Sequence, residues 1–427
     1  MIIKKDIKRI AVNTIFLSML QMFNYVMPFF LFPYLMYILG TKNFGAWMLV
    51  LSITQYLNIL IDYGFNLSAT RKVTLFKNDK VKINQLFTNV MFVKLLFFAF
   101  AFGLVVICNN GINNLLHIPN GLMLEMFLYL FGLILTPFWL FQGLEQLKVP
   151  TVLNLIARMV SVIATFFFVR QGSDIFLLPI INGIPLILTG IISWLLLYRQ
   201  EVLLVFPKWS FMKSEIKEGA DLFISSISVT LYTTLNTVLL GVFAGPQSVA
   251  YYSICEKIIQ AIKSVVTPLY QATYPYMVKA LNDIKGISMK KLKILLLLSL
   301  SMGILIILGL SIFNEVILNY FFNRGFNTSV KYTLLIMSCI PLISFINNVL
   351  FIQTLVPLGE SKYLRKVTII AGVINIVFVC IFSQYLEDVG SALGYMLSEL
   401  TVLIFGGVKI YLMLTKKKEK GGLIGGT

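Results

Sequence analysis

The run of 25 uncharged residues from Thr14 to Ile38 is the feature that most constrains the fold of this chain. A helix of about 20 apolar residues spans the hydrocarbon core of a bilayer. The run follows the charged start MIIKKDIKR. It is far longer than the apolar segment of a signal peptide, and no small-residue cleavage site follows it. The sequence therefore predicts a retained first membrane span.

Similar apolar runs, each bounded by charged or turn residues, recur along the whole chain. They predict spans at 14–38, 46–70, 86–108, 122–147, 151–169, 176–198, 219–243, 250–278, 294–313, 332–356, 367–386 and 390–414. These runs are long and do not alternate as barrel strands do, so we expect helices. The composition agrees, because 58% of the 427 residues are hydrophobic and only 12% are charged, against about 25% charged in soluble domains.

The positive residues follow the predicted topology. The chain carries 35 Lys and Arg against 18 Asp and Glu, a net charge of +17. If the N-terminus is cytoplasmic, 26 of the 35 bases fall on the inner side, four on the outer side and five within spans. This asymmetry indicates a multi-pass protein of the cytoplasmic membrane with both termini inside. We expect no nucleic-acid partner, because no soluble basic surface interleaved with stacking aromatics can be built.

The spans are predicted to form two six-helix halves, residues 1–205 and 206–427, with a basic cytoplasmic tail. The segment ILGTKNFGAW at 38–47, between the first two spans, is weakly similar to VFAGPQSVAYY at 242–252, between the seventh and eighth spans. In each half, the second of these two spans is followed by a basic loop. Since six is even, the halves would share one orientation and be related by a pseudo-two-fold axis along the membrane normal. The predicted fold is therefore an all-α polytopic membrane protein with about twelve helices.

Ionisable residues inside the spans are candidates for a binding site, because a charge at the bilayer centre costs roughly 2.5 kcal/mol or more. The bases Lys94, Arg158, Lys257 and Lys263 are predicted to contact an anionic cargo in a cavity between the halves, and the acids Asp62, Glu256 and Glu399 are candidates for ion coupling or gating. The alternatives are snorkelling for Lys94 and Arg158, and buried ion pairs. Glu256 shares a stripe with Lys263, and either Asp62 or Glu399 could pair with one of these bases.

Polar and aromatic side chains repeat at helical spacing in the same spans and predict faces turned away from lipid. The residues placed in the cavity are Gln21, Asn24, Tyr25, Gln55, Gln260, Tyr270 and Tyr274. Interhelical hydrogen bonding and packing are the alternatives for these side chains.

Signatures of several other protein classes are absent from the sequence. The dipeptide Gly-Lys and the pattern GxGxxG do not occur, so we expect no nucleotide-driven mechanism. The only histidine, His117, lies in a predicted outer loop, and four cysteines stand singly. We therefore expect no metal site, no catalytic residues and no cofactor.

The first 72 residues resemble bacterial polysaccharide flippases of the O-antigen (Wzx-type) class, within the multidrug/oligosaccharidyl-lipid/polysaccharide superfamily. The resemblance rests on NYVMPFFLFPYLMYILGTKNFG at 24–45 and on DYGFNLSATRK at 62–72. The rest of the chain agrees in span number, loop lengths and charge. Drug-extruding antiporters share the twelve helices but are not expected to carry the second motif.

The resemblance implies a MATE-like fold in which the first two helices of each half line a central cavity. It implies alternating access, coupling to an ion gradient, and an undecaprenyl-diphosphate-linked glycan as cargo. It further implies a polysaccharide polymerase and chain-length proteins as candidate partners. Asp62 and Arg71 match the acidic and basic motif positions, and Gly40, Gly45 and Gly64 match glycines expected to shape turns.

Three hypotheses remain open at this point. The first is a flippase for lipid-linked oligosaccharides, and the second is a cation-coupled exporter of drugs or other small molecules. The third, a membrane-embedded glycan enzyme, is disfavoured because the predicted outer loops are short and nearly uncharged.

Overall fold

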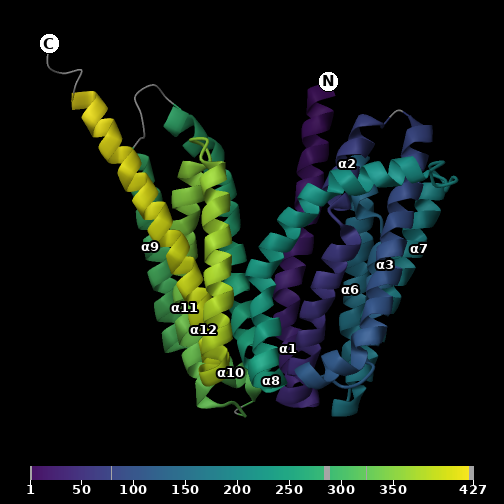
Figure 1. The fold of residues 1–427 in the computed structure, drawn as a ribbon, viewed down its shortest axis with the longest axis horizontal. Helices are drawn as coiled ribbons and strands as arrows, with labels where there is room; N and C mark the ends of the chain where they lie inside the picture. The colour runs from purple at the N-terminus through teal and green to yellow at the C-terminus, as the bar shows by residue number, and fades with distance from the viewer. Residues whose placement is uncertain (1, 78, 283–288, 324, 423–427) are drawn as a thin grey trace. The chain divides into compact units, whose positions relative to one another are not determined.

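A computed structural model describes residues 2–77, 79–282, 289–323 and 325–422 of the chain (Figure 1). Within these ranges the side chains of 2–22, 24, 221, 225–233, 280–282, 289–291, 414 and 416–422 lie outside the description. The described residues fold as helices joined by short connections, as the sequence predicts. They divide into two compact units, one made of residues 1–234 with 245–250 and the other of residues 235–244 with 251–427.

The first unit contains the helices of the N-terminal part and the beginning of α8. Their bounds are α1 Ile2–Asp62, α2 Phe65–Leu75, α3 Lys80–Leu116, α4 Leu122–Leu135, α5 Phe138–Gly143, α6 Lys148–Phe168, the 3₁₀-helix η1 Gly172–Phe176, α7 Leu177–Tyr198 and α8 Trp209–Asn282. Helix α4 packs along α7, α7 contacts α6, and α1 contacts both α3 and α6. This packing places side chains of α1, α3, α4 and α6 around one cavity, which is described below.

The second unit contains the rest of α8 and the C-terminal helices. Their bounds are α9 Met289–Ile312, α10 Asn314–Phe322, α11 Thr328–Asn347, the π-helix η2 Asn348–Leu355 and α12 Ser361–Gly422. Helix α11 packs against both α9 and α12. A core cluster of Val266, Tyr270, Met277, Leu292, Leu295, Phe345 and Val349 joins α8 to α9, α11 and η2.

Nine segments of the described residues are long and apolar enough to cross a membrane. Three of them, Tyr25–Leu75, Thr234–Lys279 and Ser361–Met413, are 46 to 53 residues long and each covers two predicted spans. The long helices α1, α8 and α12 bend at Gly40, Gly245 and Glu387, whose backbone dihedrals are not helical. Gly40 (φ 74°, ψ 166°) and Gly245 (φ 79°, ψ 179°) adopt nearly the same conformation, which is almost restricted to glycine.

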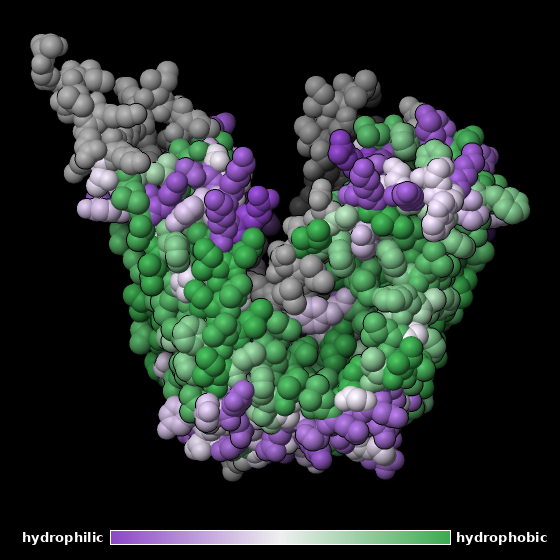
Figure 2. All heavy atoms as spheres, viewed as in Figure 1, coloured by the Kyte–Doolittle hydropathy of each residue, from purple (hydrophilic) through white to green (hydrophobic). Residues whose placement is uncertain are grey.

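The surface pattern of each unit fits a membrane-spanning protein. Figure 2 shows hydrophobic side chains over the middle of each unit and hydrophilic side chains towards its ends. Large apolar side chains such as Ile107, Phe167, Leu305 and Ile404 are well exposed along the helices. Such exposure suits contact with lipid tails, which are as apolar as the side chains themselves. The chain is an all-helical, multi-pass membrane protein.

Two predicted spans are interrupted in the structure. The predicted span 46–70 ends at Asp62, because Tyr63 and Gly64 have positive φ and a new helix, α2, begins at Phe65. The predicted span 122–147 is broken at Thr136 and Pro137, because proline has no amide hydrogen to donate within a helix. The residues at 62–72 around the first break are mostly polar, whereas the second break lies in an apolar run. The predicted span bounds placed neither break.

Candidate functional site

Two of the predicted intramembrane charges form an ion pair inside the first unit. Lys94 Nζ on α3 lies 2.7 Å from Asp62 Oδ1 at the last residue of α1. The Lys94 side chain is 8% exposed and that of Asp62 is 17% exposed, so both charges are largely removed from solvent. Helix α1 ends at this position because the next two residues turn the chain into α2. The break that the hydropathy pattern missed therefore places Asp62 opposite Lys94.

A polar cavity of about 230 Å³ adjoins this ion pair. Its charged lining residues are Asp62, Lys94 and Arg158, and the amides of Asn58, Asn66 and Asn154 and the hydroxyl of Thr136 complete its polar surface. The lining comes from α1, α2, α3, α4, α5 and α6, together with the break between α4 and α5. Three of the predicted site residues thus lie around one cavity within a single unit.

Arg158 also lines a second cavity of about 130 Å³, which lies further along α6 towards Thr165. Ser161, Thr165 and Asn182 give this cavity polar groups, and Phe23, Met27 and Leu31 of α1 give it an apolar wall. The Arg158 side chain is exposed, and no carboxylate among the described side chains pairs with it. Lys94 is neutralised by Asp62, whereas Arg158 remains an uncompensated cation of the described site.

A second charged cluster lies in the other unit, around Lys263 of α8. Lys263 Nζ lies 3.5 Å from Glu399 Oε1 and 3.4 Å from the hydroxyl of Tyr395, both on α12. Asn347 of α11 donates to Glu399 Oε2 at 2.9 Å and to the Glu399 backbone carbonyl at 3.0 Å. The carboxylate of Glu399 is therefore held by groups from two other helices.

The remaining predicted charges of α8 lie near this cluster in the sequence. Lys263 pairs with Glu399 rather than with Glu256, because seven residues of helix separate Glu256 and Lys263 by roughly 10 Å. The Glu256 side chain is buried at 8% exposure. Lys257 is half-buried and donates to Gln260 Oε1 at 3.4 Å. From the predicted stripe of α8, Lys263 contacts Glu399 and Tyr395 directly, and the charge of Glu256 acts on Lys263 and Tyr395 from a greater distance.

The predicted polar and aromatic residues have different surroundings. Tyr25 and Gln55 are exposed on α1, and Tyr274 is half-buried on α8. Tyr270 is buried in the core cluster of the second unit, and its hydroxyl shares a hydrogen bond of 2.9 Å with Ser299, so the packing alternative describes it. The side chains of Gln21 and Asn24 fall outside the described residues.

The motif glycines occupy positions where a side chain would strain the backbone or clash with a neighbour. Gly40 and Gly64 have φ of 74° and 80°, and Gly64 begins α2. A Cβ atom at Gly45 would lie 1.7 Å from the carbonyl oxygen of Pro246, so α1 and α8 approach closely here. Arg71 is exposed on α2, where its charge acts on Glu218. Gly40 and Gly64 lie where the backbone turns, whereas Gly45 lies within α1 at a close contact, so the role of the three glycines in the motif stays a prediction.

Several polar residues of the two clusters did not stand out in the sequence. Asn66, Asn347 and Tyr395 lie in runs that read as ordinary span residues, and their partners are distant in the chain. An amide within an apolar run is the only signal that could have singled out Asn347. No group of three His, Cys, Asp or Glu side chains that could hold a metal ion occurs among the described residues.

The chain is similar to known proteins along most of its length. The family described as "Polysaccharide biosynthesis protein" matches residues 10–281. An Escherichia coli (strain K12) protein named "Putative O-antigen transporter" is 27% identical over 401 residues, which cover 91% of this chain and 94% of that protein. A protein of the same name from Shigella dysenteriae is 26% identical, with coverage of 92% and 98%.

Solved structures with the same fold are distant in sequence. A lipid II flippase, MurJ, in an inward closed conformation has a TM-score of 0.72 at 15% identity and covers 93% of this chain and 87% of its own. An inward-facing multidrug resistance MATE family transporter of the MOP superfamily has a TM-score of 0.70 at 13% identity, with coverage of 93% and 96%. These likenesses show that the fold resembles that of MATE and MurJ proteins. The family match spans both motifs that carry the resemblance of the sequence and confirms it: the chain belongs to the polysaccharide biosynthesis protein family.

Proposed function

We propose that this protein is a flippase that carries an undecaprenyl-diphosphate-linked oligosaccharide, as used for O-antigen or a similar surface glycan, across the cytoplasmic membrane. Membership of the polysaccharide biosynthesis family and the relatives named as O-antigen transporters support this cargo class. We further propose that twelve helices in two six-helix halves move by alternating access and use an ion gradient. The three bent helices, each covering two predicted spans, support this helix number.

The observation that carries the proposal is the exposed, uncompensated guanidinium of Arg158 between two polar cavities. A guanidinium binds phosphate oxygens through paired, charge-assisted hydrogen bonds. At about 230 Å³ and 130 Å³, the cavities are small for a whole oligosaccharide and suit a phosphate-bearing head. Arg158 would therefore hold the diphosphate, and the amides beside it would complete the hydrogen bonds.

The two ion pairs have a different proposed role. Lys94 with Asp62 and Lys263 with Glu399 are compensated pairs of mostly buried charges, so neither lysine offers a free positive charge to the cargo. Protonation of either carboxylate would release its lysine. We propose that such release couples cargo binding to an ion gradient.

Complementation tests the proposal in a host that lacks its own O-antigen flippase. We expect the wild-type protein to restore surface glycan and Arg158→Ala to lower it by roughly tenfold or more, since a charged hydrogen-bonded contact contributes about 1.5–3 kcal/mol. Arg158→Lys should retain part of the activity, because it keeps the charge but loses the paired hydrogen bonds. Arg365→Ala, which removes an exposed arginine of α12, is the matched control.

Three outcomes would contradict the proposed function. Drug resistance without glycan export would indicate an exporter of small molecules. A glycan product altered by the purified protein would indicate an enzyme. Full export by Arg158→Ala at wild-type expression would remove the assignment of this residue.

A further inference from the structure

A separate cavity of about 430 Å³ lies where the start of α3 meets the first turns of α8. Its lining shares no residue with the cavities around Arg158, and it comprises Lys72, Phe76, Val81, Lys82, Gln85, Leu86, Lys208, Phe211, Ser214, Glu215 and Glu218. The segments around it are the basic loops that the charge distribution places on the cytoplasmic side. The site is therefore separate from the cavities that we assign to the cargo.

The connection between α7 and α8 forms one wall and is held firmly on α3. Gln85 donates to the carbonyl of Phe206 at 3.2 Å, Thr88 Oγ1 accepts from the Val205 amide at 2.9 Å, and Asn89 Oδ1 accepts from the Lys208 amide at 3.1 Å. All three bonds use backbone groups of the connection, so the apolar side chains of the connection remain free to face away from α3.

Those outward side chains suit a membrane interface. Phe206 is 93% exposed and Trp209 is 70% exposed, only a few residues beyond Tyr198, where the span of α7 ends. Tryptophan and tyrosine prefer the level of the lipid headgroups. The cavity therefore lies beside the headgroup layer of the bilayer.

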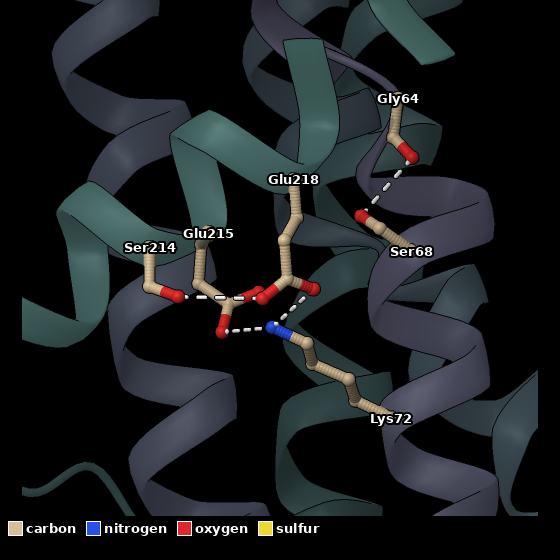
Figure 3. Close-up of polar contacts among 6 residues, drawn as sticks. All are labelled: Gly64, Ser68, Lys72, Ser214, Glu215 and Glu218. Atoms are coloured by element: carbon tan, nitrogen blue, oxygen red, sulfur yellow. Dashed lines mark hydrogen bonds and ion pairs between the residues drawn. The ribbon is translucent and has the colours of Figure 1, made fainter. Parts of the chain in front are cut away.

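One part of this cavity carries an excess of negative charge. Figure 3 shows Lys72 Nζ between two carboxylates, 2.7 Å from Glu215 Oε1 and 3.0 Å from Glu218 Oε2. Glu215 is 3% exposed, whereas Glu218 is 52% exposed and can meet a ligand. The hydrogen bond from Lys72 holds the pKa of the Glu218 carboxyl below its usual value, and Arg71 outside the cavity adds a weaker effect. One lysine thus faces two carboxylates, and Glu218 stays ionised.

Positive charge lies elsewhere in the lining. Lys82 pairs with Asp79 at 3.1 Å, and no carboxylate among the described side chains pairs with Lys208. Phe76, Val81, Leu86 and Phe211 give the cavity its apolar lining. The cavity therefore offers a lysine without a carboxylate partner among the described side chains, a half-exposed carboxylate whose neighbouring lysine is shared with Glu215, and an apolar wall.

We propose that this cavity binds the headgroup of a phospholipid with a primary ammonium group, a phosphatidylethanolamine, from the adjacent leaflet. The lipid phosphate accepts hydrogen bonds from Lys208 and Lys82, and the ammonium donates to Glu218. The apolar wall takes the start of the acyl chains beside Phe206. An anionic lipid satisfies the lysines but adds no donor for the half-exposed carboxylate of Glu218, whose partners within the protein are Lys72 and Ser214.

Native mass spectrometry of the purified full-length protein tests the site with lipids of increasing N-methylation. From phosphatidylethanolamine to phosphatidylcholine the headgroup charge is constant, while the ammonium loses its hydrogen-bond donors. We expect the wild-type protein to retain phosphatidylethanolamine roughly tenfold better than phosphatidylcholine, as loss of a charged hydrogen bond predicts. Glu218→Gln should remove this preference, and Lys208→Gln should weaken retention of both lipids.

Glu315→Gln and Lys42→Gln are the matched controls, because they change exposed side chains that do not line the cavity. Equal retention of the two lipids by the wild-type protein would overturn the proposal, and this comparison needs no variant. Stronger retention of phosphatidylglycerol than of phosphatidylethanolamine would also overturn it. Glycan export is not the readout, so the result is independent of the proposed transport function.

Discussion

The ion pair between Lys94 and Asp62 gives a prediction at the scale of single residues. Replacing only Asp62 by asparagine leaves Lys94 buried without a counter-charge, and removal of one partner of a buried pair costs about 3–5 kcal/mol in soluble proteins. We expect Asp62→Asn and Lys94→Met each to lower the Tm of the purified protein. The double variant should recover most of the loss. Equal and additive losses would show that the two side chains do not interact.

The sequence predicted which charges belong to the site but not how they pair. Lys94, Arg158 and Asp62 could be identified because ionisable residues are rare within apolar runs. Their assembly around one cavity could not be predicted, because 32 residues separate Asp62 from Lys94. The same holds for Lys263 and Glu399, which lie on different helices. Pairing depends on helix packing, and a single sequence carries little information about it.

At the scale of elements, two long helices bend at glycines in a conformation that other residues rarely adopt. Gly40 and Gly245 have ample space, since a Cβ atom at either would meet nothing within 4 Å. The backbone conformation itself makes a side chain unfavourable there by about 1–3 kcal/mol. We therefore expect Gly40→Ala and Gly245→Ala each to lower the Tm.

Gly103 and Gly309 provide controls for these variants, because a Cβ atom there also has open space but φ is ordinary. Alanine at either control position should leave the Tm unchanged or slightly raised. If alanine at Gly40 and Gly245 behaves as it does at the controls, the bends are not fixed by backbone conformation.

Apolar runs predicted where the helices lie but not where they continue or break. The span 14–38 and the first part of the span 46–70 both lie in α1, on either side of the bend at Gly40, whose backbone dihedrals are not helical. The start of the short helix α2 lay inside the predicted span 46–70, although the positive φ values of Tyr63 and Gly64 end α1 before it and its residues are mostly polar. The similarity between 38–47 and 242–252 was informative, since both segments contain the bend glycine.

At the scale of the whole molecule, the distribution of basic residues predicts which end of each helix faces outwards. Cys108 is exposed in the C-terminal half of α3, near the predicted outer side, whereas Cys255 is fully buried. We expect a membrane-impermeant thiol reagent to label a variant that keeps only Cys108 when it is added to intact spheroplasts. A variant that keeps only Cys255 should stay unlabelled. If Cys108 is labelled only after the membrane has been opened, the actual topology is the opposite of the predicted one.

Translocation in sealed proteoliposomes tests the central claim most directly. The purified protein would be reconstituted with an undecaprenyl-diphosphate-linked oligosaccharide, and arrival of the glycan at the opposite leaflet would be followed with a lectin that cannot cross the bilayer. The proposed function predicts translocation by the wild-type protein, a roughly tenfold or greater loss with Arg158→Ala, and no loss with Arg365→Ala. If folded wild-type protein moves the glycan no faster than protein-free liposomes do, the result contradicts the proposed function.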